Sequence, residues 1–363
     1  MPNEDRVAQL DEVPADLVDE MRAEGFFGWS IPELFGGAGL TTEELVLGAL
    51  EISQCSVAFR ARVGTNTGIG SEGIVVDGTV AQKQRYLPRL ASGEWTACLA
   101  VTEPDAGSEA SNVQTTARPD GDAWILDGDK RYITNAPIAD VFTITARTEP
   151  GSKGARGVSA FVVERGTAGL ETGAPYRKMG QAGSPVGDVR LRNCRVAAGQ
   201  VIGGLEGHGF KTVMKTLNKQ RIHLAALSTG PAMRMLEMAV AHTQARVQFG
   251  HSVASYQLVQ ALIADCRTEI YAARSMILET ARRRDAGDDV ALEASMCKYF
   301  ATEMCGRVAD RCVQMFGGAG YIADHAAIER WYRDVRLFRL YEGTSQIHQL
   351  NIARLTLAEG NAP

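Results

Sequence analysis

The feature that most constrains the fold is a change in hydrophobic period along the chain. Apolar residues recur at helical spacing from Val13 to about Leu90, give way to short β-rich runs between Cys98 and Val201, and then return to helical spacing. The helical and strand periods place side chains on different faces. A segment whose apolar residues follow the helical period therefore packs poorly as a strand, and the reverse is also true. The order α, β, α therefore predicts distinct structural regions, and 363 residues are enough for two or three of them.

The C-terminal region has the clearest helical pattern. Two apolar stripes step by three and four residues: Val259, Ile263, Cys266, Ile270, Ala273 and Ile277, then Ala294, Cys297, Ala301, Met304, Val308, Cys312 and Met315. The linker 285–289 predicts an antiparallel helical hairpin, and Gly317-Gly318 predicts its end. Another helix is expected from about Phe210 to Phe249, with a break near Gly230-Pro231. These helices predict a four-helix bundle.

The middle region is rich in β-formers. Its short runs are 98–101, 113–116, 123–126, 141–145 and 158–163, with turn residues such as Pro119-Asp120-Gly121-Asp122 between them. This pattern predicts an antiparallel sandwich or barrel. The predicted fold is α+β and mainly α, with an N-terminal helical domain (1–97), a β domain (98–203) and a C-terminal bundle (204–363).

Composition narrows the class of protein. A net charge of −5 argues against nucleic-acid binding, and no apolar run is long enough for membrane insertion. The seven cysteines contain no C-x-x-C, and Cys266, Cys297 and Cys312 lie on apolar helical faces, which predicts small buried side chains in a reducing compartment. The acidic N-terminus lacks the apolar core of a signal peptide, so a cytoplasmic location is expected.

Two segments of the β region have the composition of ligand-binding loops. Leu99–Ser108 leaves a predicted strand and enters a turn of small residues, whose N–H groups and hydroxyls (Thr102, Ser108) suit an anion or a polar heterocycle. A plain surface turn would look similar. In Arg131–Asn135, Tyr132 and Thr134 are two apart, so a regular strand would point both to one face, where one could stack on a ring and the other bond to it.

The segment 341–346 near the C-terminus contains a carboxylate, Glu342, between an aromatic residue and Gly343. Glycine lets the backbone turn and approach a ligand. Thr344 or Ser345 is expected to cap the helix that starts near Ile347, with Glu342 just before it. Arg246–Gly250 and Gln314–Gly320 end predicted helices and are either ligand loops or plain C-caps.

Three common enzyme classes lack their sequence signatures here. No glycine triplet of Rossmann spacing lies between a strand and a helix, and no G-x-S-x-G elbow occurs. The six histidines show no zinc-ligand spacing.

Taken together, the ordered motifs resemble the acyl-CoA dehydrogenase family over nearly the whole chain. The segments that carry the resemblance are 99–108, 132–134, 178–180, 218–221, 246–250, 314–318 and 341–346. The resemblance implies FAD between the β domain and the bundle, an acyl-CoA substrate, an electron-transfer flavoprotein as partner, and a homotetramer whose neighbouring subunits complete each site.

The resemblance also implies roles for individual residues. Those expected to bind FAD are Leu99, Val101, Thr102, Gly107, Ser108, Tyr132, Ile133, Thr134, Arg246, Phe249, Gln257, Gln314, Met315, Gly317, Gly318, Thr344 and Gln346. Those expected to bind substrate are Ser108, Asn218, Arg221, Tyr341 and Gly343. Within these sets, Tyr132 would pack on the flavin ring, and Arg246 and the 314–318 loop would hold a neighbour's cofactor.

Glu342 is the expected catalytic base. It would take the α-proton of the thioester while the β-hydrogen leaves as hydride to the flavin, and burial by substrate would raise its pKa. Some relatives place the base one residue before the arginine that matches Arg221, but Gln220 occupies that position here. Glu342 is therefore the only candidate at either position.

The chain departs from the family pattern in three places. The N-terminal layer is expected to be shortened, Gln181 and Ala182 stand where an aromatic residue and an arginine are frequent, and Asn218 replaces a frequent aspartate. Two alternatives to a dehydrogenase are an oxidase of the same fold that uses oxygen and a catalytically silent CoA-binding scaffold. The length and branching of the acyl group depend on small side-chain differences in the pocket floor.

Overall fold

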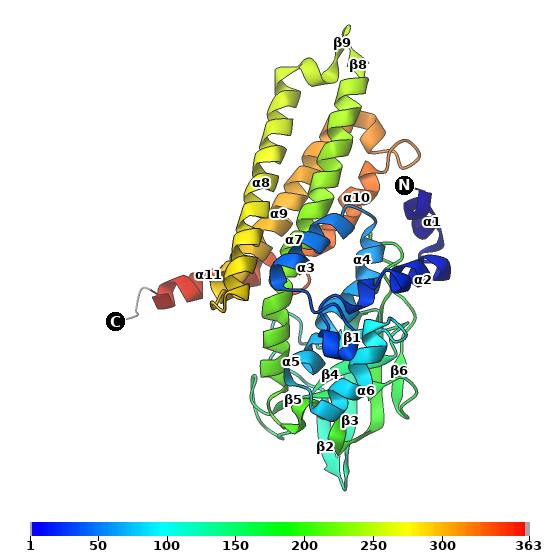
Figure 1. Ribbon diagram of the computed structural model, residues 1–363, viewed down its shortest axis with the longest axis vertical. Coiled ribbons are helices and arrows are strands. Elements are labelled where there is room, and N and C mark those ends of the chain that lie inside the picture. Colours follow the sequence, from blue (N-terminus) through cyan, green and yellow to red (C-terminus); the bar gives the residue numbers. More distant parts are fainter. Residues whose placement is uncertain (1, 360–363) are drawn as a thin grey trace. The chain divides into compact units, whose positions relative to one another are not determined.

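The computed structural model describes residues 2–359 and divides into two compact units. The first unit runs to Leu40 and then takes in Ala58–Arg177 and Ala182–Gln220. The second comprises Thr41–Val57, Lys178–Gln181 and the chain from Arg221 onward. The helical, β and helical regions predicted from the hydrophobic period are confirmed (Figure 1).

The first unit contains a seven-stranded sheet in the order β1-β4-β2-β3-β7-β6, with β5 paired to β4. The strands are β1 (Ala97–Ala100), β2 (Thr116–Asp120), β3 (Ala123–Thr134), β4 (Val141–Arg147), β5 (Val158–Glu164), β6 (Leu170–Thr172) and β7 (Val186–Ala197). Most pairs are antiparallel, as predicted. β1 and β2 instead run parallel to β4, because neither strand is joined to β4 by a tight hairpin.

The helices of the first unit precede the strands of the sheet in the chain, except for the start of α7, which follows them. They are α1 (Pro2–Leu10), α2 (Ala15–Ala23), α4 (Val57–Gly64, from Ala58), α5 (Glu72–Asp77), α6 (Val80–Ala91) and α7 (Gly209–Ala245) as far as Gln220. Asn66 lies in a π-helical turn at Thr65–Ile69 and is fully buried. Its amide donates to the carbonyls of Leu90 and Trp95 and accepts from the Ala97 N–H, which fixes the start of β1.

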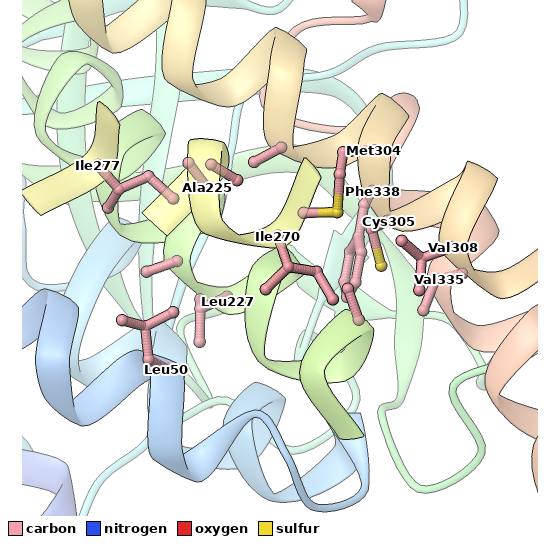
Figure 2. Packing of buried hydrophobic residues seen from close by; sticks show 14 of the residues in the cluster. Leu50, Ala225, Leu227, Ile270, Ile277, Met304, Cys305, Val308, Val335 and Phe338 are labelled. Atoms are coloured by element: carbon pink, nitrogen blue, oxygen red, sulfur yellow. The ribbon is translucent and has the colours of Figure 1, made fainter. Parts of the chain in front are cut away.

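The second unit is a helical bundle. It contains α3 (Thr42–Ile52), α7 from Arg221, α8 (Gln257–Asp285), α9 (Ala291–Phe316), α10 (Ile328–Val335) and α11 (Ser345–Glu359). Thr41 and Glu44 form a capping box at the start of α3. Both predicted stripes face a common core, in which residues from α3, α7, α8, α9 and α10 pack together (Figure 2).

Helix α7 differs from its prediction at two points. It continues without a break through Gly230 and Pro231, where a side chain on Gly230 would meet Ser53 Oγ at 2.0 Å, so glycine permits close packing at this point. It also ends at Ala245 rather than near Phe249. Arg246 is followed by a small hairpin of β8 (Val247–Gln248) and β9 (His251–Ser252), whose turn residues Phe249 and Gly250 both have positive φ, as a type I′ turn requires.

The cysteine prediction holds for the helical stripes. Cys266, Cys297 and Cys312 are buried free thiols. Within residues 2–359 no helix is long and apolar enough to cross a bilayer. The same residues contain no group of three or more histidine, cysteine or acidic side chains placed to hold a metal ion.

Candidate active site

A buried ion pair anchors the loop that follows β1. Lys130 Nζ on β3 lies 2.7 Å from Glu103 Oε1, and the two side chains are 0% and 2% exposed. Glu103 also accepts hydrogen bonds from the backbone N–H groups of Gln114 and Thr115 and from the Thr115 hydroxyl. Burial lowers the pKa of Lys130 to about 8, while the negative charge of Glu103 opposes that change. The pair thus ties both ends of the loop to the sheet.

The anchored loop leaves its tip accessible. Glu103 and Ala106 exchange backbone hydrogen bonds of 3.1 and 3.2 Å, which closes a tight turn. Beyond it Gly107 and Ser108 are exposed, and a side chain on Gly107 would meet nothing within 4 Å. Of the other expected flavin-contact residues on this loop, Leu99, Val101 and Thr102 are half-buried.

Tyr132 lies at a β-bulge. The register of β3 against β7 shifts between Lys130 and Ile133, and Tyr132 has a φ of 59°. The regular alternation from which we expected Tyr132 and Thr134 to share a face is therefore interrupted, because a left-handed residue re-aims its side chain. Tyr132 is 61% exposed, Ile133 is buried and Thr134 is half-buried.

The Tyr132 ring is supported from the side. Tyr176 packs against it with ring centroids 5.6 Å apart, and the Tyr176 hydroxyl donates to Asp188 at 2.7 Å. The Arg131 guanidinium lies 6.0 Å from the Tyr132 ring centroid. Sequence reasoning missed Tyr176, since no motif or periodic pattern marks it. The Arg131 N–H donates to the Thr102 carbonyl at 2.8 Å, which joins this strand to the loop that contains the open glycine turn. An exposed, supported aromatic ring and an open glycine turn fit a flat heterocycle that carries phosphate groups.

Asn135 fixes the end of β3. It has a φ of 62° and is fully buried. Its side-chain amide donates to the Ala61 carbonyl and to Thr65 Oγ1, both at 2.9 Å, and its backbone N–H donates to the Pro185 carbonyl. These bonds hold the segment just after Thr134 in place.

In the second unit, the Glu342 loop has a strained backbone. Glu342 has a φ of 53° and Gly343 a φ of 93°. A non-glycine residue in the left-handed region costs on the order of 1–3 kcal/mol and persists only where its surroundings enforce it. Here Lys298 Nζ donates to the Gly343 carbonyl at 2.7 Å, and His348 Nε2 lies 3.2 Å from the Glu342 carbonyl.

The capping prediction is confirmed at Thr344. The Ile347 N–H donates to Thr344 Oγ1 at 3.3 Å, so Thr344 caps α11 and Glu342 lies just before the helix. The Ser345 hydroxyl instead donates to Glu303 on α9 at 2.5 Å. Tyr341 stacks on Phe338 with ring centroids 6.1 Å apart, and Gln346 is exposed.

Several buried titratable groups interact electrostatically around this loop. Burial lowers the pKa of Arg221, and the negative charge of Glu342 opposes that change. Burial also lowers the pKa of Lys298 to about 8 and that of His348 to about 3. At neutral pH, the Glu342 carboxylate therefore interacts electrostatically with two cations, Arg221 and Lys298, while His348 is neutral. Sequence reasoning identified Glu342 and Arg221 but missed Lys298 and His348, which appear there as ordinary helical residues.

The segment after Lys178 docks on α10. The Gln181 N–H donates to the Asp334 carboxylate, and the Gln181 side-chain amide donates to the Asp334 carbonyl at 3.0 Å. A side chain on Gly180 would lie 2.6 Å from the Arg333 carbonyl carbon. Burial raises the pKa of Asp334 to about 6. Gln181, which departs from the family pattern, thus has a clear anchoring contact.

The remaining predicted residues of the bundle lie far from Glu342 within one chain. His242 stacks on Phe316 with centroids 4.2 Å apart, which brings the end of α7 to the end of α9. Arg246, Phe249, Gln257, Gln314, Met315, Gly317 and Gly318 all belong to this end of the bundle. At 1.5 Å per residue, Gln314 lies roughly 24 Å along α9 from Lys298, which holds the Glu342 loop.

Asn218, by contrast, is half-buried on α7, three residues before Arg221.

Comparison with known proteins assigns the family. Three domain models match in order: "Acyl-CoA dehydrogenase, N-terminal domain" at residues 1–94, "middle domain" at 98–194 and "C-terminal domain" at 207–357. The chain therefore belongs to the acyl-CoA dehydrogenase family, whose members are FAD-dependent oxidoreductases.

Relatives in this family carry names of both oxidising and reducing enzymes. The chain is 40% identical to a 3-(aryl)acrylate reductase of Clostridium sporogenes (97% of this chain, 93% of the relative). It is 36% identical to an acyl-CoA dehydrogenase of Bacillus subtilis (98% and 93%) and 35% identical to the CarC subunit of the caffeyl-CoA reductase–Etf complex of Acetobacterium woodii (97% and 92%).

Solved structures agree with the fold. Butyryl-CoA dehydrogenase from Megasphaera elsdenii matches with a TM-score of 0.94 and 31% identity over 98% of this chain and 93% of that one. PigA with FAD and proline matches with a TM-score of 0.94 and 30% identity over 99% and 93%.

Proposed function

We propose that this protein is an FAD-dependent acyl-CoA dehydrogenase that converts an acyl-CoA thioester to the trans-2-enoyl-CoA, with Glu342 as the base. The observation that carries the proposal is the Glu342 loop. The Glu342 backbone is left-handed, which costs free energy, and contacts from Lys298 and His348 to the carbonyls of the loop hold it in that conformation. The Glu342 carboxylate also interacts electrostatically with Arg221.

The first unit supplies residues that suit the cofactor. The open turn at Gly107 and Ser108 and the supported ring of Tyr132 would hold its phosphate and ring portions, with Leu99, Val101, Thr102, Ile133 and Thr134 beside them. FAD, when bound, supplies the two-electron acceptor for the hydrogen that leaves the β-carbon as hydride. The Glu103–Lys130 pair holds the loop in its binding shape.

The second unit supplies the proton chemistry. The α-proton of a thioester is weakly acidic, so its removal needs a fixed base and hydrogen bonds to the carbonyl oxygen as negative charge develops there. Glu342 would take the proton, and its own backbone N–H would donate to that oxygen. Arg221, where the second unit's part of α7 begins, would hold the thioester, and Asn218, three residues earlier on the same helix, would hold its CoA portion.

Gln220 supports Glu342 as the base. Its amide cannot accept a proton usefully, and its side chain is buried against the π-helical turn, where a side chain on Gly68 would meet Gln220 Oε1 at 2.6 Å. The alternative position for a base is therefore filled by a neutral packing group.

The names of the relatives favour a second candidate, the reverse reaction. A 3-(aryl)acrylate reductase and a subunit of a caffeyl-CoA reductase complex are both more than 30% identical to this chain over nearly its full length. In that direction Glu342 would deliver a proton to the α-carbon of a 2-enoyl thioester while the β-carbon would take a hydride from the reduced cofactor, because the same residues serve a reaction and its reverse.

We also propose an electron-transfer flavoprotein as partner and a homo-oligomer. The caffeyl-CoA reductase relative is named as part of a complex with such a flavoprotein. The position of Arg246, Gln314 and Gly317 at the far end of the bundle from the Glu342 loop supports cofactor contacts from a neighbouring subunit.

An anaerobic titration of the purified protein tests the proposal. Its absorption spectrum should show bound flavin, and acyl-CoAs of graded length should bleach it with a preference for one length class. Slow return of colour in air supports a dehydrogenase, whereas fast return supports an oxidase. Reoxidation of the chemically reduced protein by 2-enoyl-CoAs alone, with no bleaching by any acyl-CoA, would favour the reductase. A protein that takes up no added FAD would contradict both.

A further inference from the structure

Side chains of helix α9 hold the Glu342 loop in place. Lys298 donates to the Gly343 carbonyl, and Glu303 accepts from the Ser345 hydroxyl and pairs with Arg339 at 3.4 Å. A side chain on Gly306 would lie 3.1 Å from the Arg339 guanidinium carbon, so glycine leaves room for that contact. Three successive turns of one helix therefore hold both sides of the loop.

Lys298 is the unexpected member of this set. It is fully buried, and taking an ammonium group out of water is costly unless opposite charge compensates it. Glu342 on the loop and Glu303 on α9 favour its charged form, while Arg221 on α7 disfavours it. His348 on α11 faces the positive charges of Lys298 and Arg221 and is neutral at pH 7. A neutral donor would satisfy the Gly343 carbonyl at a lower cost in desolvation.

We propose that Lys298 is a positioning residue for the base: its ammonium group fixes the Glu342–Gly343 turn through the Gly343 carbonyl, and its charge keeps Glu342 ionised until substrate binds. The inference rests on the proposed role of Glu342. It goes beyond a structural role, because a lysine that only packed and bonded would stabilise the fold without changing the titration of Glu342.

The test compares the titration of Glu342 in four proteins: wild type, Lys298→Met, Lys298→Arg and Met304→Leu. The Met variant removes the charge and the donor, and the Arg variant keeps the charge. Met304 is buried on the same helix in the hydrophobic core, so its swap to leucine controls for mild destabilisation. Infrared difference spectra of each protein against its own Glu342→Gln counterpart isolate the Glu342 carboxyl band, which is followed against pH.

The expected result is a titration midpoint raised by about one pH unit or more in Lys298→Met, because a nearby positive charge is lost. Lys298→Arg and Met304→Leu should keep the wild-type midpoint. A folded Lys298→Met protein with an unchanged midpoint overturns the proposal. The infrared readout needs no turnover. A wild type without activity would therefore contradict the proposed function, and this inference could still be tested.

A second measurement serves if Lys298→Met does not fold. Lys298→Gln removes the charge but keeps a side-chain donor for the Gly343 carbonyl, so its Glu342 midpoint should also rise by about one pH unit or more. A folded Lys298→Gln protein with the wild-type midpoint would overturn the proposal.

Discussion

The chemistry of single residues here depends on backbone conformation as well as side-chain type. Glu342 and Gly343 are both left-handed, and the contacts from Lys298 and His348 offset the cost of that conformation. Tyr132 and Phe249 are also left-handed, in other segments that we propose to contact a ligand. Three of the non-glycine residues proposed to contact ligands thus have a left-handed backbone, as do Asp11 and Asn193 outside the proposed site.

Gly343 is the first residue to test. In Gly343→Ala, the new methyl group would face a φ of 93° and lie 3.0 Å from His348 Nε2. We expect the variant to lose most activity and about 1–2 kcal/mol of stability in denaturant unfolding. Gly287→Ala is a matched control, since Gly287 has a φ of 98° but nothing within 4 Å. It should lose comparable stability and keep its activity; equal activity losses in both would contradict the role of the His348 contact.

His348 should make stability depend on pH. Its folded-state pKa is about 3 against an ordinary 6.5, so the unfolded chain binds a proton between these values that the folded chain does not. The free energy of unfolding should therefore fall as pH drops from 6.5 toward 3. Asp334, whose pKa is raised to about 6, acts in the opposite direction.

The variant His348→Gln isolates this effect, because the Asp334 contribution cancels between the two proteins. The stability advantage of the wild type over the variant should shrink as the pH is lowered from 7 to 4 in urea unfolding experiments. An advantage that stays constant over this range would show that His348 is not a buried neutral group.

At the level of elements, the buried Glu103–Lys130 pair links the loop after β1 to β3. Lys130→Met leaves the Glu103 charge buried without its partner, which should cost about 3–5 kcal/mol and release bound FAD. Adding Glu103→Gln should recover part of the stability. Lys219→Met breaks a partly buried pair that does not involve this loop, with Glu72 on α5, and should retain FAD after gel filtration. Equal FAD loss from both lysine variants would mean general destabilisation.

The sequence predicted elements better than their pairings. The two long stripes located α8 and α9, because burial of one face imposes the helical period directly. The parallel pairing of β1 with β4 was missed, since local pattern does not record which distant strand becomes a neighbour. The continuous α7 was missed because Gly230 and Pro231 suggest a break unless their packing against α3 is known. Similarly, the bulge at Tyr132 has no local signature.

At the scale of the whole molecule, the proposed site residues of the bundle fall into two groups at opposite ends. The motifs that carry the family resemblance could be placed from sequence, and the Glu342 loop forms as expected before α11. Lys298 and His348 could not be predicted, because only tertiary packing brings them to that loop.

Subunit complementation tests whether the far group serves a neighbour. Glu342→Gln and Arg246→Glu chains should each be inactive alone. Co-expressed with different tags and purified as mixed oligomers, they should regain activity, because an intact Glu342 loop then meets a neighbour's intact Arg246. Mixed oligomers without activity would place Arg246 outside a shared site.

Glu342 is proposed to move the α-proton of the thioester. The direct measurement is anaerobic stopped-flow absorbance of flavin bleaching by the preferred acyl-CoA in wild type and in Glu342→Gln, with FAD content measured in both. We expect equal FAD content and a bleaching rate lower by about 10²–10⁴-fold in the variant, because the fixed base is lost. A Glu342→Gln protein that binds FAD and bleaches at the wild-type rate would show that Glu342 is not the base.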